Sequence, residues 1–213
     1  MNSNQDVWNN IYRNGGKFGV SRFVVRMGEL LPEGSRVLDY GCGKGQNAIC
    51  LAEKRIHVIG FDISDEAVRK AITAADEAGV AEMVRFFVSD GLNPSIPPEE
   101  TFDGVVCTYV LDHFPPGLPK PIDRVLFERG LSHVQGFVRP GGYAVVSYAT
   151  KHIWPKIDEQ ELREIDREYP VRRLSEFFYG WEVFSTVGQN GDKQTPWGVK
   201  NNLDAEILAR KPL

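Results

Sequence analysis

The sequence is poor in cysteine and contains no long apolar run, and both shortages limit the kind of protein that it can encode. Its three cysteines, Cys42, Cys50 and Cys107, are odd in number and lack the spacing of metal ligands. We therefore expect reduced thiols rather than a disulfide framework, and no zinc site. No stretch of about eighteen apolar residues occurs, and the first six residues are polar, so neither a membrane span nor a signal peptide is expected. These absences predict a soluble, cytoplasmic protein.

Basic residues are not in excess either. Lysine and arginine number 25 against 29 aspartates and glutamates, which gives a formal net charge of -4. Because neutralising phosphates needs a basic face, this balance argues against a nucleic-acid partner, although it leaves room for a local basic pocket. With 42% hydrophobic and 25% charged residues, the composition is that of an ordinary globular protein, and we expect one domain over residues 1–213.

A glycine-rich turn after the first apolar run is the most informative motif. Gly41, Gly43 and Gly45 stand at alternate positions, where glycine permits a positive φ and a close approach of the backbone to a ligand. An amphipathic segment, a second apolar run and Asp62 follow, so the pattern predicts strand, tight turn, helix, strand and acid. The dinucleotide fingerprint requires a third glycine at the position of Gln46, and a P-loop ends in Gly-Lys-Ser/Thr. The turn therefore predicts a nucleotide-like cofactor, but pyrophosphate fits it poorly.

Strand patterns alternate with helical patterns along most of the chain. This alternation predicts an α/β protein with a Rossmann-like, doubly wound, mostly parallel sheet covered on both faces. The last two strand patterns have no helix between them, so they must pair antiparallel. The polar loop at 188–202, with Pro196 and Trp197, is long enough to be either functional, as a lid or partner contact, or disordered. Strands are expected at 36–40, 56–62, 84–89, 102–109, 143–148, 181–187 and 204–210, and helices around Trp8, from Ser21, and at 44–54, 65–78, 122–138 and 158–168.

Four motifs occur in a fixed order between Arg36 and Tyr148. They are Asp39-x-Gly41-x-Gly43-x-Gly45, the acid Asp62, the segment Val110-Leu111-Asp112-His113-Phe114 after the fourth strand pattern, and Arg139-Pro140-Gly141-Gly142 before the fifth. Together they resemble the class I S-adenosylmethionine-dependent methyltransferases. The resemblance implies the seven-stranded class I methyltransferase fold. It divides the chain into an N-terminal helical cap (1–33), a cofactor-binding core (34–150) and a substrate-side helix with the final antiparallel strands (151–213).

The resemblance also implies S-adenosylmethionine as the cofactor and assigns its contacts. The glycine turn would run beside the amino-acid part of the cofactor, and Asp62 would accept both ribose hydroxyls, for which a carboxylate is well suited. Asp90 would bind the adenine amino group. Two structural roles compete with these assignments, namely Asp62 as a helix cap and Asp90-Gly91 as a plain turn. The implied cofactor residues are Asp39, Gly41, Gly43, Gly45, Asp62, Ile63, Asp90, Gly91, Cys107 and Tyr109.

The implied chemistry is in-line displacement at a sulfonium methyl group, which needs alignment of the reacting atoms and in some cases a base. His113 is the candidate base because the motif places it at the mouth of the cleft, and a structural role as an anchor is the alternative. No metal is expected, because no Asp-Asn pair follows the fifth strand to join Asp112 in holding magnesium. Aromatic residues that flank the cleft could wall a small-molecule pocket or cover the core. The candidate substrate residues are Trp8, Tyr12, Tyr109, His152 and Trp154.

A missing motif indicates the class of substrate. Enzymes that methylate amino groups of nucleic acids or proteins often carry Asn/Asp-Pro-Pro-Tyr/Phe after strand four, whereas this chain has Thr108-Tyr109-Val110-Leu111. We therefore favour a small-molecule substrate over nucleic acid or protein. Trp8-x-x-x-Tyr12 also resembles the opening of tellurite-resistance and thiopurine-type small-molecule methyltransferases. Two functions of different classes compete with this one: a catalytically silent S-adenosylmethionine-binding partner subunit and a nicotinamide-dependent dehydrogenase. The sequence leaves the oligomeric state open.

Overall fold

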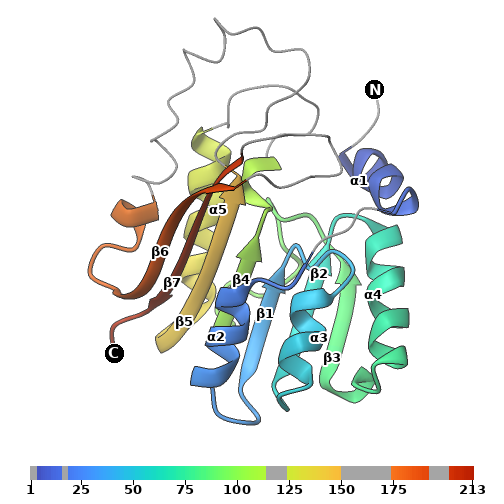
Figure 1. Ribbon diagram of the computed structural model, residues 1–213, viewed down its shortest axis with the longest axis horizontal. Helices are drawn as coiled ribbons and strands as arrows, with labels where there is room; N and C mark the ends of the chain where they lie inside the picture. The colour runs from blue at the N-terminus through green and yellow to red at the C-terminus, as the bar shows by residue number, and fades with distance from the viewer. Residues whose placement is uncertain (1–3, 16–18, 114–123, 150–173, 192–201) are drawn as a thin grey trace, which may run out of the picture.

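Seven strands form one sheet in the order β3-β2-β1-β4-β5-β7-β6 (Figure 1). The computed structural model describes residues 4–15, 19–113, 124–149, 174–191 and 202–213. Strands β1 to β5 pair in parallel, whereas β7 runs antiparallel to both β5 and β6. The predicted fold class, a mostly parallel sheet with a C-terminal antiparallel pair, is confirmed. The strands are β1 (Arg36–Tyr40), β2 (His57–Asp62), β3 (Val84–Val88), β4 (Phe102–Thr108), β5 (Val138–Ala149), β6 (Glu182–Gly191) and β7 (Asn202–Arg210).

The strand order reverses next to β1, and this reversal determines where a ligand can bind. From β1 the chain proceeds outward to β2 and β3 and then returns to β4, on the other side of β1. Ligands of open parallel sheets bind outside the carboxyl ends of the strands at such a reversal. The carboxyl edge is the side where β1 ends at Tyr40, β2 at Asp62 and β4 at Thr108; the amino edge is the opposite side, where these strands begin.

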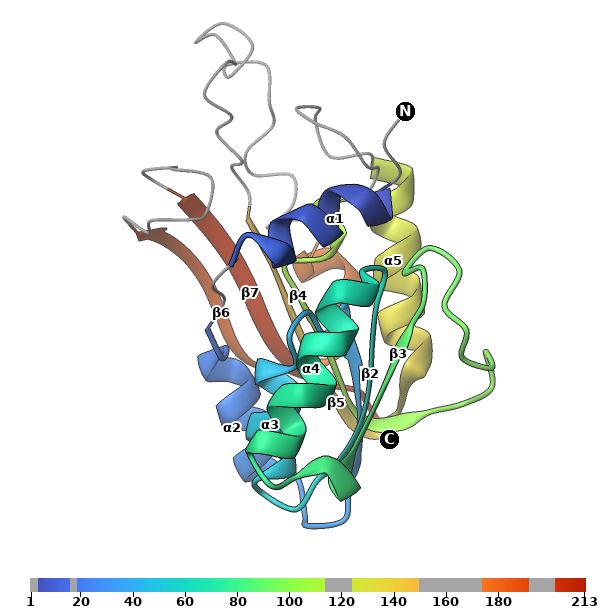
Figure 2. The ribbon, with the colours of Figure 1, turned by 90° about the vertical axis from the view of Figure 1, so that its right-hand side faces the viewer.

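Helices cover both faces of the sheet, with α2, α3 and α4 on one face and α5 on the other (Figures 1 and 2). Side chains alternate along a strand, so β1 directs Val37 toward α2 and α3, and Leu38 and Tyr40 toward α5. By the same alternation, Asp39 of β1 and Asp62 of β2 lie on the α2–α3 face. The helices are α1 (Asn4–Arg13), α2 (Arg22–Leu30), α3 (Gln46–Ala52), α4 (Asp65–Glu77) and α5 (Arg124–Phe137), with 3-10 turns η1 (Ala81–Met83) and η2 (Leu111–His113).

Two apolar clusters stabilise this arrangement, one on each side of the sheet. Phe127 and Leu131 of α5 are fully buried against one face, and Val24 and Met27 of α2 are fully buried against the other. Complete burial of such side chains contributes about 1.5–3 kcal/mol each before entropy is counted. Among the described residues, no helix combines the length and the apolar character needed to cross a membrane.

Several element boundaries differ from those expected. Helix α3 begins at Gln46 rather than at residue 44, because Gly45 takes the left-handed conformation with φ 80°. Strand β5 begins at Val138 rather than at residue 143, since Val138 pairs with Phe102 before a register shift in the ladder. Strands β6 and β7 reach Gly191 and Asn202, so both ends of the expected 188–202 loop are strand. The expected helix at 158–168, Pro196 and Trp197 lie outside the described residues.

Candidate functional site

The glycine turn after β1 leaves no space for side chains. Gly41 has φ 75° and Gly43 has φ 54°, in the left-handed region that L side chains rarely adopt. A Cβ at Gly41 would lie 2.3 Å from Val110 Cγ2, and a Cβ at Gly43 would lie 2.8 Å from the Tyr12 hydroxyl oxygen. Glycine is therefore required at both positions by conformation and by space. The turn is thus packed between the end of β4 and helix α1.

Asp39 is a buried carboxylate with an unused acceptor. It is 1% exposed, and it accepts a hydrogen bond from the Ala48 backbone N–H of α3. In the part of the chain that the structure describes, Asp39 Oδ2 has no hydrogen-bond partner. Burial, and after it the negative charge of Asp62, raises the pKa of Asp39 to about 7. Because a cationic donor beside Oδ2 would stabilise the ionised form, this position suits an ammonium group.

Asp62, at the end of β2, is also buried, but its hydrogen bonds come from the backbone. It is 8% exposed; its Oδ2 accepts from the Gly43 N–H over 3.0 Å and its Oδ1 from the Ser64 N–H over 2.9 Å. Burial raises the pKa of Asp62 to about 6, against the opposite effect of these bonds and of one from Ile63. A carboxylate offers about four lone-pair sites, so acceptor capacity remains. The N-cap of α4 is Ser64 rather than Asp62.

Helix α1 lies across the carboxyl edge, above the start of α4 (Figure 2). Its Tyr12 is 5% exposed and places its hydroxyl against Gly43. Burial first, and then the charge of Asp62, raises the pKa of this hydroxyl. One helical turn earlier, the Trp8 ring meets the His113 ring edge-on, with 4.7 Å between centroids. Helix α1 therefore joins two predicted substrate residues to the glycine turn and to the predicted base.

The backbone is strained where β4 ends. Tyr109 has φ 57°, a conformation that costs a non-glycine residue on the order of 1–3 kcal/mol. Its N–H donates to the Ser147 carbonyl of β5 over 2.7 Å, which holds it there. Strain of this kind clusters at functional sites. The chain then turns through η2, where the His113 N–H donates to the Val110 carbonyl over 3.0 Å.

A row of polar side chains at the carboxyl edge was not among the predicted residues. Thr108, Ser147 and Glu206 lie side by side in β4, β5 and β7. Asn47 of α3 donates to Thr108 Oγ1 over 3.0 Å and accepts from the Ser21 N–H over 3.1 Å, and the Ser21 hydroxyl donates to the Glu206 carboxylate. Ser147 Oγ is buried and has no partner among the described residues. The sequence signal for this row is a polar residue beside each apolar strand run, after the run for Thr108 and Ser147 and before it for Glu206 of the antiparallel β7.

The remaining predicted residues lie in the turn after β3, in the apolar core or outside the described residues. Asp90 is exposed, and its Oδ1 accepts the N–H two residues ahead over 2.9 Å, as expected for a plain turn. Gly91 is buried, and its carbonyl accepts from the Tyr40 hydroxyl. The Cys107 thiol lies in the apolar core on the α5 side, so the prediction for this residue is restricted to its backbone atoms. His152 and Trp154 lie outside the described residues.

Among the described residues, the side chains of the types that bind metals are spread over the structure. Within the ranges that the structure describes, no three histidine, cysteine, aspartate or glutamate side chains come together as a metal site. Cys42, Cys50 and Cys107 are thiols rather than members of disulfides, and burial raises the pKa of Cys42. The groups gathered at the carboxyl edge include the carboxylates of Asp39, Asp62 and Glu206, backbone N–H donors, hydroxyls and aromatic rings, which suit an organic, partly cationic ligand.

Comparison with known proteins identifies the family. A family model described as a methyltransferase domain matches residues 14–187, which is most of the chain. The chain belongs to this methyltransferase family. A ubiquinone biosynthesis O-methyltransferase of Alkalilimnicola ehrlichii is 30% identical over 152 residues, covering 71% of this chain and 55% of that protein. A protein-L-isoaspartate O-methyltransferase of Thermococcus onnurineus is 28% identical over 169 residues, covering 77% of this chain and 65% of that protein.

A solved structure is similar in fold to this protein. The N-methyltransferase NodS from Bradyrhizobium japonicum, in complex with S-adenosylhomocysteine, has a TM-score of 0.70 at 14% identity and covers 100% of both chains. The two curated relatives are longer, and the chain spans 55% and 65% of their lengths. The predicted family, the class I S-adenosylmethionine-dependent methyltransferases, is confirmed, together with the class of cofactor that defines it. Membership of this family favours a methyltransferase over the alternative of a nicotinamide-dependent dehydrogenase.

Proposed function

We propose that the protein transfers the methyl group of S-adenosylmethionine to a small molecule. The observation that carries the proposal is the buried pair Asp39 and Asp62 at the reversal of strand order, with Asp39 Oδ2 lacking a partner among the described residues. A bound cofactor would present an ammonium group to Asp39, where the opposite charges attract. It would present the ribose hydroxyls to Asp62, whose oxygens accept hydrogen bonds. The glycine turn allows the backbone to approach the amino-acid part closely.

The chain's own residues would exclude water, align the substrate and accept a proton. When bound, S-adenosylmethionine supplies the methyl group and leaves as S-adenosylhomocysteine. Helix α1 covers the carboxyl edge with Tyr12, and Trp8 stands against His113 at the outer side. In this proposal the imidazole of His113 takes the proton that an oxygen or nitrogen nucleophile loses, while Trp8 contacts the substrate.

A small molecule is supported by burial and charge. Asp39 and Asp62 are under 9% exposed, and so is Tyr12 of the covering helix α1, which favours a substrate small enough to enter a covered site. The net charge of -4 argues against nucleic acid. The name of the ubiquinone biosynthesis relative refers to a small-molecule pathway, whereas that of the isoaspartate relative refers to a protein substrate. The test must therefore include both classes.

A labelled-methyl screen tests the proposal. The protein is incubated with S-adenosylmethionine carrying a labelled methyl group and with a metabolite library, an isoaspartyl peptide and duplex DNA in separate reactions. We expect label in one or more metabolites and none in peptide or DNA. Label confined to the peptide or DNA would contradict the small-molecule assignment. Cofactor binding by calorimetry without transfer to any acceptor would support a catalytically silent subunit instead.

A further inference from the structure

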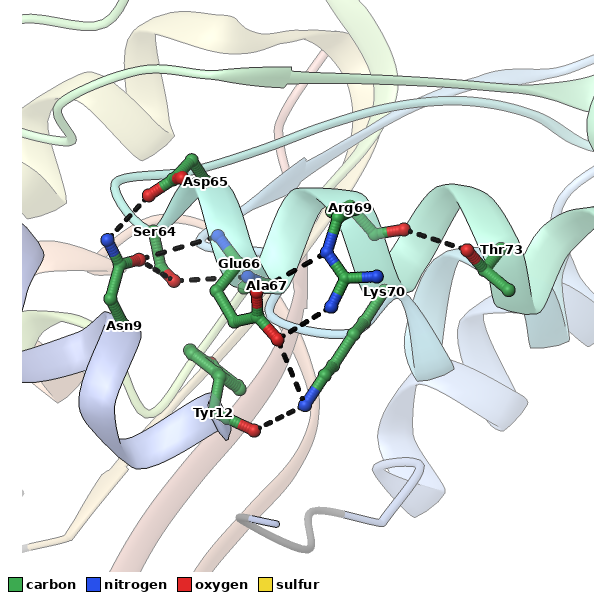
Figure 3. A network of polar contacts seen from close by, with 9 residues as sticks. All are labelled: Asn9, Tyr12, Ser64, Asp65, Glu66, Ala67, Arg69, Lys70 and Thr73. Carbon is green, nitrogen blue, oxygen red and sulfur yellow. Dashed lines mark hydrogen bonds and ion pairs between the residues drawn. The ribbon is translucent and has the colours of Figure 1, made fainter. Parts of the chain in front are cut away.

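Asn9 is a buried polar side chain on α1 that makes its contacts with α4 rather than with the glycine turn. It is 7% exposed. Its Oδ1 accepts from the Ser64 hydroxyl over 2.6 Å and from the Glu66 N–H over 3.4 Å, and its Nδ2 donates to Asp65 Oδ1 over 2.5 Å (Figure 3). Both ends of the amide are therefore used, which fixes the side chain on the first turn of α4.

Ser64 connects Asn9 to the carboxylate at the end of β2. Its Oγ caps α4 by accepting from the Ala67 N–H over 3.0 Å, and its own N–H donates to Asp62 Oδ1 over 2.9 Å. The other oxygen of Asp62 accepts from Gly43. Tyr12, on the same helix as Asn9, lies against Gly43. Helix α1 therefore contacts this series of hydrogen bonds at two points, at Ser64 through Asn9 and at Gly43 through Tyr12.

A second tether holds the other end of α1. Lys70 Nζ donates to the Tyr12 carbonyl over 2.6 Å and forms an ion pair with Glu66 over 3.2 Å (Figure 3). The carbonyl groups of a helix's last turn have no partner within the helix, and Lys70 supplies one. A helix of 10 residues is not stable alone in water, so the position of α1 depends on such contacts.

We propose that Asn9 is a positioning residue for the cofactor: it seats α1 on the first turn of α4 and so keeps Tyr12 over the glycine turn next to Asp62. The inference rests on the cofactor named in the proposed function and adds how that cofactor is retained. If Asn9 loses its contacts, α1 keeps the Lys70 tether but loses its seat on the first turn of α4, so Tyr12 covers the glycine turn less firmly and S-adenosylhomocysteine leaves a less covered site. The expected effect is on the dissociation rate, since most changes of affinity at a given site appear there.

The dissociation rate of S-adenosylhomocysteine from the full-length protein tests the inference. Asn9→Ala removes the contacts with α4, and Asn10→Ala, an exposed position on the same helix, is the matched control. We expect Asn9→Ala to release S-adenosylhomocysteine about tenfold faster, the effect of one buried hydrogen bond, and Asn10→Ala to match the wild type. In a double-mutant cycle, the effects of Asn9→Ala and Ser64→Ala should sum to less than additivity, because both substitutions break the contact between Asn9 and Ser64, whereas only Asn9→Ala also removes the contacts with Asp65 and Glu66.

Three results would overturn the inference. The first is a release rate for folded Asn9→Ala equal to that of Asn10→Ala, and this includes the case in which only the melting temperature falls. The second is full additivity of Asn9→Ala and Ser64→Ala. The third is a wild-type protein that does not bind S-adenosylhomocysteine, which removes the proposed function as well and is thereby distinguished from the first two. Should Asn9→Ala not fold, Asn9→Asp replaces the Nδ2 donor that faces Asp65 by a second carboxylate oxygen, and an unchanged release rate there counts equally against the inference.

Discussion

At opposite edges of the sheet, the pKa of Asp103 and the pKa values of Asp39 and Asp62 shift in opposite directions. At the amino edge, Asp103 accepts from the Arg36 N–H over 2.7 Å and from Arg139 Nε over 2.6 Å. Burial acts to raise the pKa of Asp103, but these bonds and the two arginine charges outweigh it, so its pKa is lowered. At the carboxyl edge, Asp39 and Asp62 are more deeply buried, and their pKa values rise to about 7 and about 6.

Under the proposed function, this difference separates a carboxylate that stabilises the fold from carboxylates that bind the cofactor. The ionised form of Asp103 is stabilised by partners that the folded protein itself supplies. Asp39 is held in the folded protein at a cost, because the hydrogen bond from Ala48 offsets the burial of its charge only in part, and a cationic ligand would offset that cost further. Carboxylates with strongly shifted pKa values cluster at functional sites, and ligands of open parallel sheets bind at the strand-order reversal. Paired substitutions at the two edges test this distinction.

The largest expected effect concerns two histidines at opposite edges. His113 follows β4 at the carboxyl edge, and His57 begins β2 at the amino edge. We predict that His113→Gln lowers kcat by about 10²–10⁴-fold, the usual contribution of a positioned base. His57→Gln should leave kcat unchanged. Steady-state kinetics with the substrate found in the screen measures both, and full activity of His113→Gln would rule out the base.

The next effect concerns affinity for the cofactor product. Asp62→Asn should weaken S-adenosylhomocysteine binding about 100-fold, or about 2.7 kcal/mol, by removing a charged acceptor from the ribose hydroxyls. Asp103→Asn should leave the affinity unchanged. Isothermal titration calorimetry gives both dissociation constants. Equal affinities for the two variants would mean that the carboxyl edge does not bind the ribose.

A smaller effect is a pH dependence of binding. Because Asp39 has a pKa of about 7 without ligand, an ammonium group that stabilises its ionised form must displace a proton below that pH. Binding of S-adenosylhomocysteine should therefore tighten as the pH rises through this range, by at most about tenfold per unit for one proton. Titrations at a series of pH values should show the slope in the wild type and in Asp103→Asn. Asp39→Asn should lose most of it, and an unaltered slope there would contradict the assignment.

The smallest effect is on the stability of the ligand-free protein, with opposite signs at the two edges. A pKa raised from 3.8 means that folded Asp39 keeps a proton that the unfolded chain releases, so its presence lowers stability as the pH rises from about 4 to about 7. The lowered pKa of Asp103 gives stability that is present above the unfolded value of 3.8 and lost as the pH falls through the folded value. At pH 8, Asp39→Asn should therefore stabilise and Asp103→Asn destabilise, each by about 1 kcal/mol in urea unfolding. A change in the free energy of unfolding that has the same sign in both variants would contradict this distinction between the two edges.

The sequence was informative about the carboxyl edge because position along a parallel strand is enough to place a residue there. Asp39 and Asp62 each end an apolar run, and in a parallel sheet such ends must meet at one edge. The C-terminal pair was predictable for an equally simple reason, since strands joined without a helix pair antiparallel. The start of α3 was misplaced because glycine adopts the left-handed conformation about as readily as the right-handed one, so the sequence does not show that Gly45 precedes the helix rather than belonging to it.

What the sequence did not predict depends on pairing between distant segments. The row of Thr108, Ser147 and Glu206 requires the register of three strands, which no local pattern encodes. The contact between Asn9 and Ser64 spans 55 positions, and an asparagine within a short amphipathic helix is indistinguishable from a solvated one until α1 and α4 are packed. Cys107 illustrates the reverse case: its motif position is at the site, but strand alternation turns its thiol into the core.

A crystal structure of the protein with S-adenosylhomocysteine tests the central claim, that Asp39 and Asp62 form the cofactor site, most directly. The account predicts the ligand at the carboxyl edge beneath α1, with its ribose hydroxyls donating to Asp62 and its amino group beside Asp39 Oδ2. A ligand bound elsewhere, or at this edge with Asp62 directed away from the ribose, would contradict it.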